Sequence, residues 1–380
     1  MERKDLGLYI HIPFCRSKCH YCDFNSFPGK EELIPGYFDA LEKEIRLYSD
    51  LLKDSLIKTV FIGGGTPSLA EPKYIYKLLG CCRDNFNLAE GAEISVEANP
   101  GTLTYEKLMA YKVSGANRLS IGLQAAQKSI LERLGRTHKF EEFRQGYILA
   151  EKTGFRNINV DLIFGIPGQD IKDWTDTVEK VLSFNPAHLS CYSLKIEEGT
   201  VFGNMLEAGK LEPAEDELDR KMYRWAIEKL GECGYRHYEI SNFARPGFEC
   251  RHNLIYWKGE EYLGIGAGAH SYLNGSRFNN LYAVEEYIAS LNSGKIPSEN
   301  VQTIERDEEM SEFMILGLRL IAGISKGEFR SRFGIDIYNV FGQTIKKLEE
   351  SKMLKAEGDF IMLTDLGLDL ANEVFVEFIK

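Results

Sequence analysis

Residues 8–24, LYIHIPFCRSKCHYCDF, decide the fold, because an apolar strand there runs directly into a short cysteine-rich loop. Three of the eight cysteines lie in this loop with the spacing Cys-x3-Cys-x2-Cys: Cys15, Cys19 and Cys22. Thiolates at such spacing hold iron–sulfur clusters, and a four-iron cubane bound by three cysteines leaves one iron open. A zinc site is the alternative, with His11 or His20 as the fourth ligand of a tetrahedron. Three cysteines directly after a buried strand favour the cluster.

The composition is that of an ordinary globular protein, with 44% hydrophobic and 27% charged residues in a chain of 380. A net charge of −11 argues against a partner held through phosphates, so we expect no nucleic-acid partner. The first residues show no secretory signal, and no apolar run approaches the roughly 20 residues of a membrane span. The cysteines do not indicate a disulfide framework, and we expect a cytoplasmic protein.

Strands and helices alternate over the first half of the chain. The opening strand is followed by apolar strands expected at residues 58–62, 93–98, 117–122, 157–164 and 187–194. Amphipathic helices are expected between and before them, at residues 34–53, 72–85, 105–114, 128–134, 140–152 and 171–184. This alternation predicts an α/β fold with a parallel sheet covered by helices, here a partial (β/α)6 barrel. A further strand is expected at the barrel edge, at residues 235–241.

Glycine and polar residues interrupt the pattern at or near the carboxyl ends of the predicted strands, where barrels of this kind carry their chemistry. The glycine run 63–65 often marks only a turn, but it also lets backbone approach a ligand closely. Glu97 could face solvent, Arg136 could be a surface charge, and Tyr9 could be a core residue. Asp161 interrupts an apolar strand, where an unpaired charge is costly, so it needs a partner such as a pair of ribose hydroxyls.

The cysteine spacing is the signature of the radical S-adenosylmethionine (SAM) superfamily, which the chain resembles along most of its length. The resemblance implies a [4Fe-4S] cluster on the three cysteines, with SAM bound at the open iron, where an electron from the cluster can cleave it. The run GGGTPS at residues 63–68 resembles the glycine motif that holds the SAM amino group. Ribose contacts are implied for Gln124 and Asp161, and a methionine carboxylate contact for Arg136. The implied SAM contacts are Tyr9, Gly64, Gly65, Thr66, Glu97, Gln124, Arg136 and Asp161.

A second group of polar and aromatic residues follows the predicted barrel, in the pattern His-Asn-x-x-Tyr-Trp: His252, Asn253, Tyr256 and Trp257. Imidazole and tyrosine can both ligate haem iron, and aromatic rings can stack on the macrocycle. A packed loop is the alternative interpretation. The nearby Cys250 does not belong to a c-type haem attachment motif, because no Cys-x-x-Cys-His sequence is present.

The last 76 residues are expected to form a separate unit of three helices, at residues 307–321, 325–333 and 340–352, and a β-hairpin at 353–364. This order resembles a winged helix. With 15 Asp and Glu against 10 Lys and Arg, its net charge of −5 favours a cap or docking role over DNA binding. We therefore divide the chain into a core barrel (1–240), a haem-motif segment and connector (241–304) and a C-terminal winged-helix-like domain (305–380).

Within the superfamily, the chain resembles the family of oxygen-independent coproporphyrinogen III dehydrogenase and its relatives. The dehydrogenases carry a fourth cysteine two positions after the third, where this chain has Phe24. Phe24 and the His-Asn-x-x-Tyr-Trp residues match the haem-chaperone class of the family instead. This implies haem binding through that segment, haem delivery to acceptor proteins including membrane-bound respiratory enzymes, and a possible homodimer. The alternatives are the dehydrogenase itself, which decarboxylates propionate side chains, and a radical SAM enzyme with another substrate.

Overall fold

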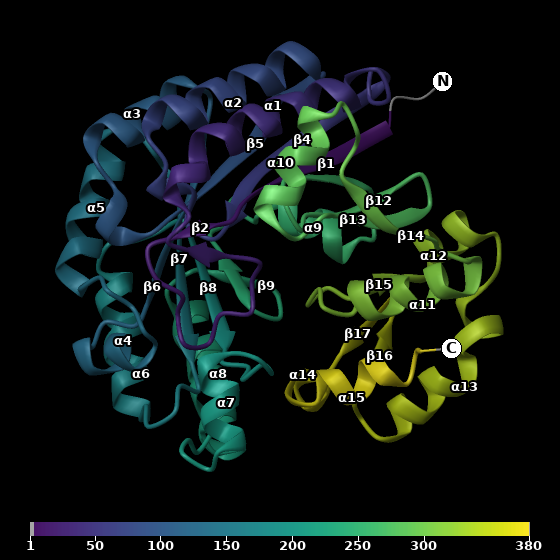
Figure 1. Cartoon of the computed structure of the whole chain (residues 1–380). Helices are drawn as coiled ribbons and strands as arrows, with labels where there is room; N and C mark the ends of the chain where they lie inside the picture. Colours follow the sequence, from purple (N-terminus) through teal and green to yellow (C-terminus); the bar gives the residue numbers. More distant parts are fainter. Residues whose placement is uncertain (1–3, 380) are drawn as a thin grey trace.

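A computed structural model of the chain describes residues 4–379, and its centre is one sheet of 12 strands. The strand order is β14-β13-β12-β11-β1-β4-β5-β6-β7-β8-β10-β9, so β14 and β9 are the two ends (Figure 1). The six strands expected from the sequence are neighbours in this order and run parallel: β1 (Lys4–Ile12), β4 (Ser55–Gly64), β5 (Leu88–Ala98), β6 (Arg118–Gln124), β7 (Asn157–Phe164) and β8 (His188–Ser193). The predicted α/β partial barrel is thereby confirmed.

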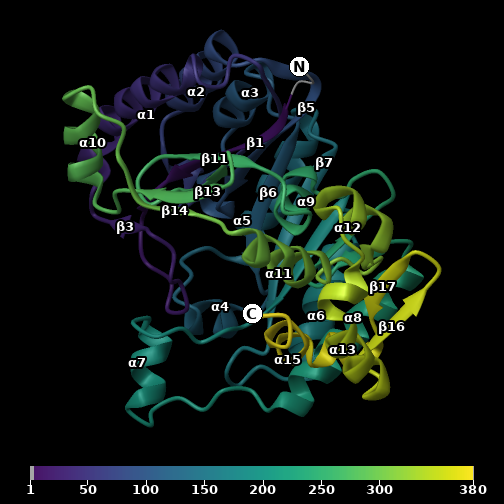
Figure 2. The ribbon, with the colours of Figure 1, turned by 90° about the vertical axis from the view of Figure 1, so that its right-hand side faces the viewer.

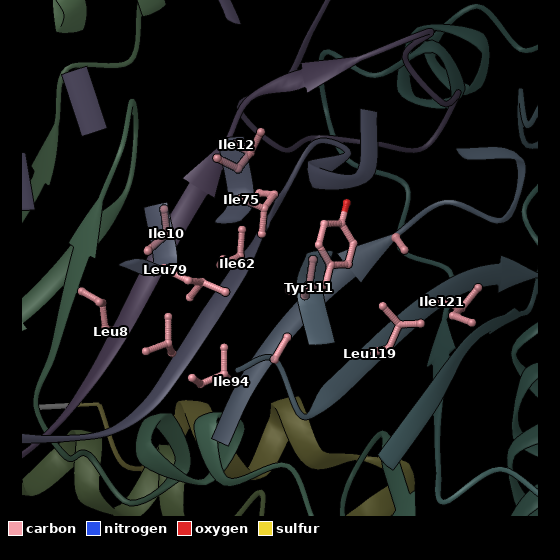
Figure 3. Packing of buried hydrophobic residues seen from close by; sticks show 14 of the residues in the cluster. Leu8, Ile10, Ile12, Ile62, Ile75, Leu79, Ile94, Tyr111, Leu119 and Ile121 are labelled. Carbon is pink, nitrogen blue, oxygen red and sulfur yellow. The ribbon is translucent and has the colours of Figure 1, made fainter. Parts of the chain in front are cut away.

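Helices cover the outer face of this sheet (Figure 1). They are α1 (Ile34–Ser49), α2 (Pro72–Asn85), α3 (Tyr105–Val113), α4 (Lys128–Arg133), α5 (Phe140–Lys152), α6 (Ile171–Leu182) and α8 (Asp216–Glu232). Alternation along β1 explains the layering, because Leu8, Ile10 and Ile12 lie in the core between sheet and helices (Figure 3). The intervening side chains Tyr9 and His11 therefore face the interior of the barrel.

The structure adds elements that the sequence pattern did not predict. On one side of β1, β11 (Tyr262–Ile265) pairs parallel to it, and an antiparallel meander continues the sheet: β12 (His270–Leu273), β13 (Ser276–Asn280) and β14 (Ser298–Thr303). Glycine permits this tight return, because a Cβ at Gly264 would collide with the carbonyl oxygen of His270. Two short helices also appear, α7 (Val201–Glu207) and α9 (Arg251–Trp257), with α10 (Val284–Asn292) before β14.

At the opposite end of the sheet, the strand expected at residues 235–241 is confirmed as β9 (Arg236–Glu239), which pairs with β10 (Asn242–Ala244). Strand β10 pairs in turn with β8 and runs antiparallel to it. The chain then returns to the barrel interior through α9. Residues 241–304 thus supply strands to both ends of the sheet.

The C-terminal part has its own hydrophobic core and lies beside the barrel (Figures 1 and 2). Its elements are α11 (Arg306–Gly317), β15 (Ile324–Ser325), α12 (Lys326–Phe333), α13 (Ile337–Glu350), β16 (Leu354–Glu357), β17 (Phe360–Leu363), α14 (Asp365–Asp369) and α15 (Ala371–Val376). The predicted three helices and hairpin are confirmed, and β15 adds a third strand to the hairpin.

The C-terminal unit contacts both ends of the large sheet. Backbone hydrogen bonds join Ile240 to Arg319 and Ile321 to Tyr238, next to β9. At the other end, the Arg277 guanidinium of β13 forms a bidentate ion pair with Glu312 of α11. None of the helices in residues 4–379 has the length and apolar character needed to cross a membrane.

Candidate cofactor site

A cavity of about 460 Å³ lies at the carboxyl ends of the parallel strands, beside the cysteine loop, residues 15–24. The structure brings ten of the predicted site residues together in its lining: Cys15, Cys19, Cys22, Gly64, Gly65, Thr66, Glu97, Gln124, Arg136 and Asp161. Tyr9, His252, Asn253, Tyr256 and Trp257 lie outside this lining. Residues from five strands and three loops thus converge on one side of the barrel.

The cysteine loop is closed by two short strands, β2 (Phe14–Cys15) and β3 (Phe27–Pro28), which pair with each other. The Cys15 Sγ lies 3.6 Å from the Thr66 Oγ1, and the Cys22 Sγ lies 3.9 Å from the Ser26 Oγ. Burial raises the pKa of the Cys15 and Cys19 thiols. Because thiolate is the form that binds metal, cluster binding here would release protons.

The zinc alternative needs a histidine beside the three thiols. His11 does not offer a free nitrogen, because its Nδ1 lies 2.9 Å from the Tyr9 hydroxyl and its Nε2 lies 2.7 Å from the Asn25 carbonyl oxygen. The His20 Nδ1 lies 2.8 Å from the Arg133 carbonyl oxygen. Within residues 4–379, no three His, Cys, Asp or Glu side chains are placed to hold one metal ion together. His11 is therefore not a fourth ligand in this arrangement.

Glycine is required where β4 passes the cysteine loop. A Cβ at Gly65 would lie 2.7 Å from the Phe14 carbonyl oxygen and 2.9 Å from the Cys15 Sγ. Gly64 has a φ of +111°, which side chains rarely adopt, and a Cβ there would also strike the His11 ring. The backbone of the glycine run therefore lies directly against the first cysteine, as a backbone-lined ligand site requires.

Two acidic side chains of the cavity have different environments. Burial and the charge of Asp161 raise the pKa of Glu97 to about 8, and its Oε2 accepts a 3.0 Å hydrogen bond from the Gly64 amide. The Asp161 carboxylate accepts hydrogen bonds from the Ser120 hydroxyl at 2.9 Å and the Asn159 amide at 2.8 Å. Asp161 thus has hydrogen-bond partners within the protein and also borders the cavity.

Arg136 is a half-buried cation whose guanidinium forms no ion pair with a carboxylate among residues 4–379. Its Nη2 donates a 2.7 Å hydrogen bond to the Tyr21 hydroxyl, and its buried Nε has no partner. A buried guanidinium needs an anion to offset the cost of desolvation. The side chain therefore fits a ligand that brings a carboxylate into the cavity.

Gln124, at the end of β6, has a φ of +71° and is not a glycine. Backbone strain of this kind costs free energy and concentrates at ligand sites. The strained turn places Gln124 in the cavity lining next to Gly122.

Tyr21 and His138 also line this cavity and were not predicted as site residues from the sequence. The His138 Nε2 lies 3.1 Å from the Leu123 carbonyl oxygen and its buried Nδ1 has no partner. Burial and the nearby Arg136 lower the pKa of His138 to about 4, so the ring is neutral. An Nε2–H that donates to Leu123 leaves Nδ1 as an acceptor for a ligand. The sequence signal for His138 as a site residue was its position two residues after Arg136.

Comparisons with known proteins identify the family of the chain. The radical SAM superfamily profile matches residues 9–181, and the HemN C-terminal domain profile matches residues 304–370. The chain is 38% identical to the heme chaperone HemW of Bacillus subtilis, over 98% of both chains. It is 36% identical to the heme chaperone HemW of Lactococcus lactis, over 100% of this chain and 98% of the relative.

The chain belongs to the HemW family of radical SAM proteins.

The HemW fold resembles that of a solved radical SAM enzyme, the coproporphyrinogen III oxidase HemN of Escherichia coli. The TM-score is 0.87 at 23% identity, over 99% of this chain and 90% of the HemN chain. At that identity the likeness shows the fold alone. Membership of the radical SAM superfamily implies a [4Fe-4S] cluster and SAM, and the thiols, the glycine backbone and the unpaired Arg136 Nε of the cavity fit these groups.

In this HemW-family chain, the His-Asn-x-x-Tyr-Trp residues lie on α9, outside the cavity lining. This helix packs against Thr59 and Phe61 of β4 in the barrel interior, a region called the floor of the barrel below. The His252 side chain is 1% exposed, and its Nδ1 lies 2.7 Å from the Thr59 hydroxyl. Its Nε2 lies 2.9 Å from the Tyr256 hydroxyl, and its ring stacks on Phe61. Burial lowers the pKa of His252 to about 3. Both ring nitrogens are thus already occupied.

Other contacts fix α9 in place. The Glu93 carboxylate accepts hydrogen bonds from the Arg251 and His252 amides at 3.2 and 3.1 Å. Trp257 lies under the Arg319 guanidinium, 4.4 Å from it, with its Nε1 buried and unpaired. Asn253 is half-buried. The helix therefore joins the barrel floor to the C-terminal unit.

Proposed function

We propose that the chain is a haem chaperone, which binds haem and passes it to acceptor haem proteins, and that it carries a [4Fe-4S] cluster and SAM. The observation that carries the proposal is the 38% identity, over 98% of both chains, to a curated heme chaperone HemW. Phe24 supports it, because this side chain occupies the position at which the dehydrogenases have a fourth cysteine. It is 58% exposed and lines the cavity.

The cavity residues have distinct proposed roles toward these cofactors. Cys15, Cys19 and Cys22 would each bind one iron as thiolates, and the cluster supplies the electron that can cleave bound SAM. Arg136 would pair with the methionine carboxylate, because its buried Nε has no protein partner. The backbone of Gly64 and Gly65, with Thr66 and Glu97, would hold the amino end.

Three more side chains of the barrel interior have proposed parts in the same site. Gln124 and Asp161 would bind the ribose hydroxyls, since amide and carboxylate groups both hydrogen-bond to hydroxyls. Tyr9 lies outside the cavity lining, and its hydroxyl is 2.9 Å from the His11 Nδ1. It would therefore contribute to SAM binding indirectly, by positioning His11.

An anaerobic reconstitution tests the cofactors. We expect about four irons and four sulfides per chain, and an electron paramagnetic resonance spectrum of the reduced protein that changes when SAM is added. The triple variant Cys15→Ala, Cys19→Ala, Cys22→Ala is the control for iron bound elsewhere. Zinc in the anaerobic protein, or a spectrum indifferent to SAM, would contradict the proposal.

A haem titration followed by absorbance tests the cargo. We expect saturable binding of one haem per chain and transfer of that haem to an apo haem protein added afterwards. Anaerobic incubation of cluster-loaded protein with coproporphyrinogen III and SAM tests the dehydrogenase alternative. Formation of protoporphyrinogen in that assay would replace the chaperone function with the enzymatic one.

The remaining expectations are proposals of the same kind. We propose that the acceptors include membrane-bound respiratory haem proteins, that the protein acts in the cytoplasm, and that it can form a homodimer. The division at residues 240 and 304 into core barrel, haem-motif segment and C-terminal domain is likewise proposed. Light scattering with and without haem measures the oligomeric state.

A further inference from the structure

A buried group of polar side chains lies on strands β7 and β8, next to Asp161 of the cavity. The two strands run parallel in a register that places Asn159 opposite His188 and Asp161 opposite Ser190. Because side chains alternate along a strand, these four residues share one face of the sheet. Asn159, His188 and Ser190 are each at most 2% exposed, so their polar atoms depend on buried partners.

The direction of the hydrogen bonds in this group follows from one backbone amide. The Cys250 N–H can only donate, and it bonds to the Tyr238 hydroxyl oxygen at 3.2 Å. The proton of that hydroxyl is then donated to the His188 Nε2, which lies 2.8 Å away. Burial and the charge of Arg118 lower the pKa of His188, so the ring is neutral and carries its proton on Nδ1.

The proton on Nδ1 fixes the orientation of the Asn159 side chain. The His188 Nδ1 lies 2.6 Å from the Asn159 Oδ1, which also accepts a 3.2 Å hydrogen bond from the Ser190 hydroxyl. The amide therefore turns its Nδ2 the other way, 2.8 Å from the Asp161 Oδ1 and 2.7 Å from the Ser120 Oγ. A flipped amide would place an oxygen against the carboxylate and an N–H against the imidazole N–H.

The Asp161 carboxylate is held through both of its oxygens. The Ser120 hydroxyl, which accepts from Asn159, donates to the Asp161 Oδ2 at 2.9 Å. The direction of the carboxylate thus depends on the orientation of the Asn159 amide. Asp161 and Ser120 line the cavity, whereas Asn159 and His188 lie behind them, outside the lining. His188 would therefore act on a ligand through Asn159 and Asp161.

We propose that His188 is a positioning residue for SAM binding: its Nδ1–H fixes the Asn159 amide, which directs the Asp161 carboxylate toward the ribose hydroxyls. This inference rests on the proposed function, because it assumes that the cavity binds SAM and that Asp161 meets the ribose. The direction matters because a hydrogen bond weakens steeply when its angle departs from linear. A residue that never touches the ligand thereby contributes to its affinity.

Calorimetric titration of SAM into the anaerobic, cluster-loaded protein tests this role. His188→Phe keeps a ring but removes the donor to Asn159, and we expect SAM binding to weaken about 10-fold. His188→Asn should stay within about threefold of the wild type, because its amide nitrogen can replace Nδ1 as the donor. His237→Phe replaces a half-buried imidazole outside this group, which bonds to the Ile240 carbonyl oxygen, and it should bind SAM like the wild type.

A double-mutant cycle separates positioning from a general loss of structure. If His188 acts through Asp161, His188→Phe should cost little further affinity in an Asp161→Asn background, since coupled residues are not additive. Tyr238→Phe gives a second cycle, because loss of its hydroxyl proton frees the His188 ring to change tautomer. It should also weaken SAM binding with Asp161 present and leave it nearly unchanged in the Asp161→Asn background.

The outcomes separate the inference from the function. A wild type that binds no SAM would overturn the proposed function and the inference together. A wild type that binds SAM, with unchanged affinity in His188→Phe, would overturn the inference alone. Equal losses from His188→Phe in the two backgrounds, or a His188→Asn variant as weak as His188→Phe, would do the same. Circular dichroism checks the fold of each variant, and the Tyr238→Phe cycle decides if His188→Phe does not fold.

Discussion

Two regions of the barrel interior differ in how their polar side chains are paired: the lining of the cavity, called the rim here, and the region around α9 and Thr59, called the floor. At the rim, the Arg136 Nε and the His138 Nδ1 are buried without partners, around a cavity of about 460 Å³. At the floor, His252 binds Thr59 and Tyr256 with both ring nitrogens, and the Glu93 carboxylate caps α9. Buried polar groups are normally paired. The unpaired nitrogens beside the cavity thus keep hydrogen-bonding capacity for a ligand, whereas the ring nitrogens of His252 are satisfied within the protein.

Substitution of the predicted cluster ligands should have the largest effect, which is loss of the cluster. We expect each of Cys15→Ala, Cys19→Ala and Cys22→Ala to abolish cluster assembly, because a cubane with two protein ligands is not retained. Iron and sulfide analysis after anaerobic reconstitution measures this. Cys233→Ser, a half-buried cysteine outside the cavity lining, should keep full iron content. Equal losses in Cys233→Ser would show that the iron is not held by the loop.

Removal of the floor histidine should affect stability and leave the cluster intact. His252→Ala should lower the free energy of unfolding by about 2–4 kcal/mol, because it leaves two buried hydroxyls unpaired and removes a packed ring. Chemical denaturation of the cluster-free protein measures the change. His252→Gln should lose less, since its amide can still bond to Thr59 or Tyr256. A fully stable His252→Ala would refute the structural role.

Arg136, whose buried Nε has no partner, should matter mainly for ligand binding. Arg136→Gln should weaken SAM binding about 10-fold or more, which is a loss of about 1.4 kcal/mol or more, while stability is kept or improved. Calorimetric titration of SAM into cluster-loaded protein measures the affinity. Arg144→Gln, an exposed arginine paired with Glu141 on α5, is the matched control. An unchanged SAM affinity in Arg136→Gln would remove this residue from the site.

The last comparison concerns two acids, the half-buried Glu97 of the cavity and the buried Glu44 of the core. Burial raises the pKa of Glu97 to about 8 and that of Glu44 to about 7, but Glu44 accepts hydrogen bonds from Gly266, Asn280 and Tyr287, whereas Glu97 accepts one from Gly64. With its pKa raised on folding, Glu97 stabilises the fold below about pH 4.5, and this contribution is lost as the pH rises toward 8.

Glu97→Gln should therefore remove part of the decline of the unfolding free energy of the cluster-free protein between pH 5 and 8, by about 1–3 kcal/mol. Glu44→Gln should instead destabilise at every pH, because a side-chain amide cannot accept from all three donors. Denaturant titrations at pH 5.5 and 8.5 compare the variants. A parallel pH dependence in wild type and Glu97→Gln would show that Glu97 ionises normally.

Local sequence patterns were enough to predict the strands of the barrel and the polar residues near their carboxyl ends. The six strands and the intervening helices follow from apolar periodicity, and strand ends place Glu97, Gln124 and Asp161 beside the cysteine loop. The floor was not predictable in this way. His252 meets Thr59 across 193 positions, and β11 joins β1 through backbone packing at Gly264. Such long-range contacts leave no period in the sequence. For the same reason the packed position of α9 could not be distinguished from an exposed ligand loop.

The attachment of the C-terminal unit has a mechanical consequence. The C-terminal unit contacts the open barrel on two sides: through the Arg277–Glu312 ion pair on β13, next to the edge strand β14, and through residues 238–240 and 319–321 at the edge strand β9. Movement of the two sides of the sheet away from each other would therefore break one of these two sets of contacts. Detachment of the C-terminal unit would also uncover the indole of Trp257, which lies 4.4 Å from the Arg319 guanidinium. We therefore expect the C-terminal unit to limit how far the barrel can open around its cavity.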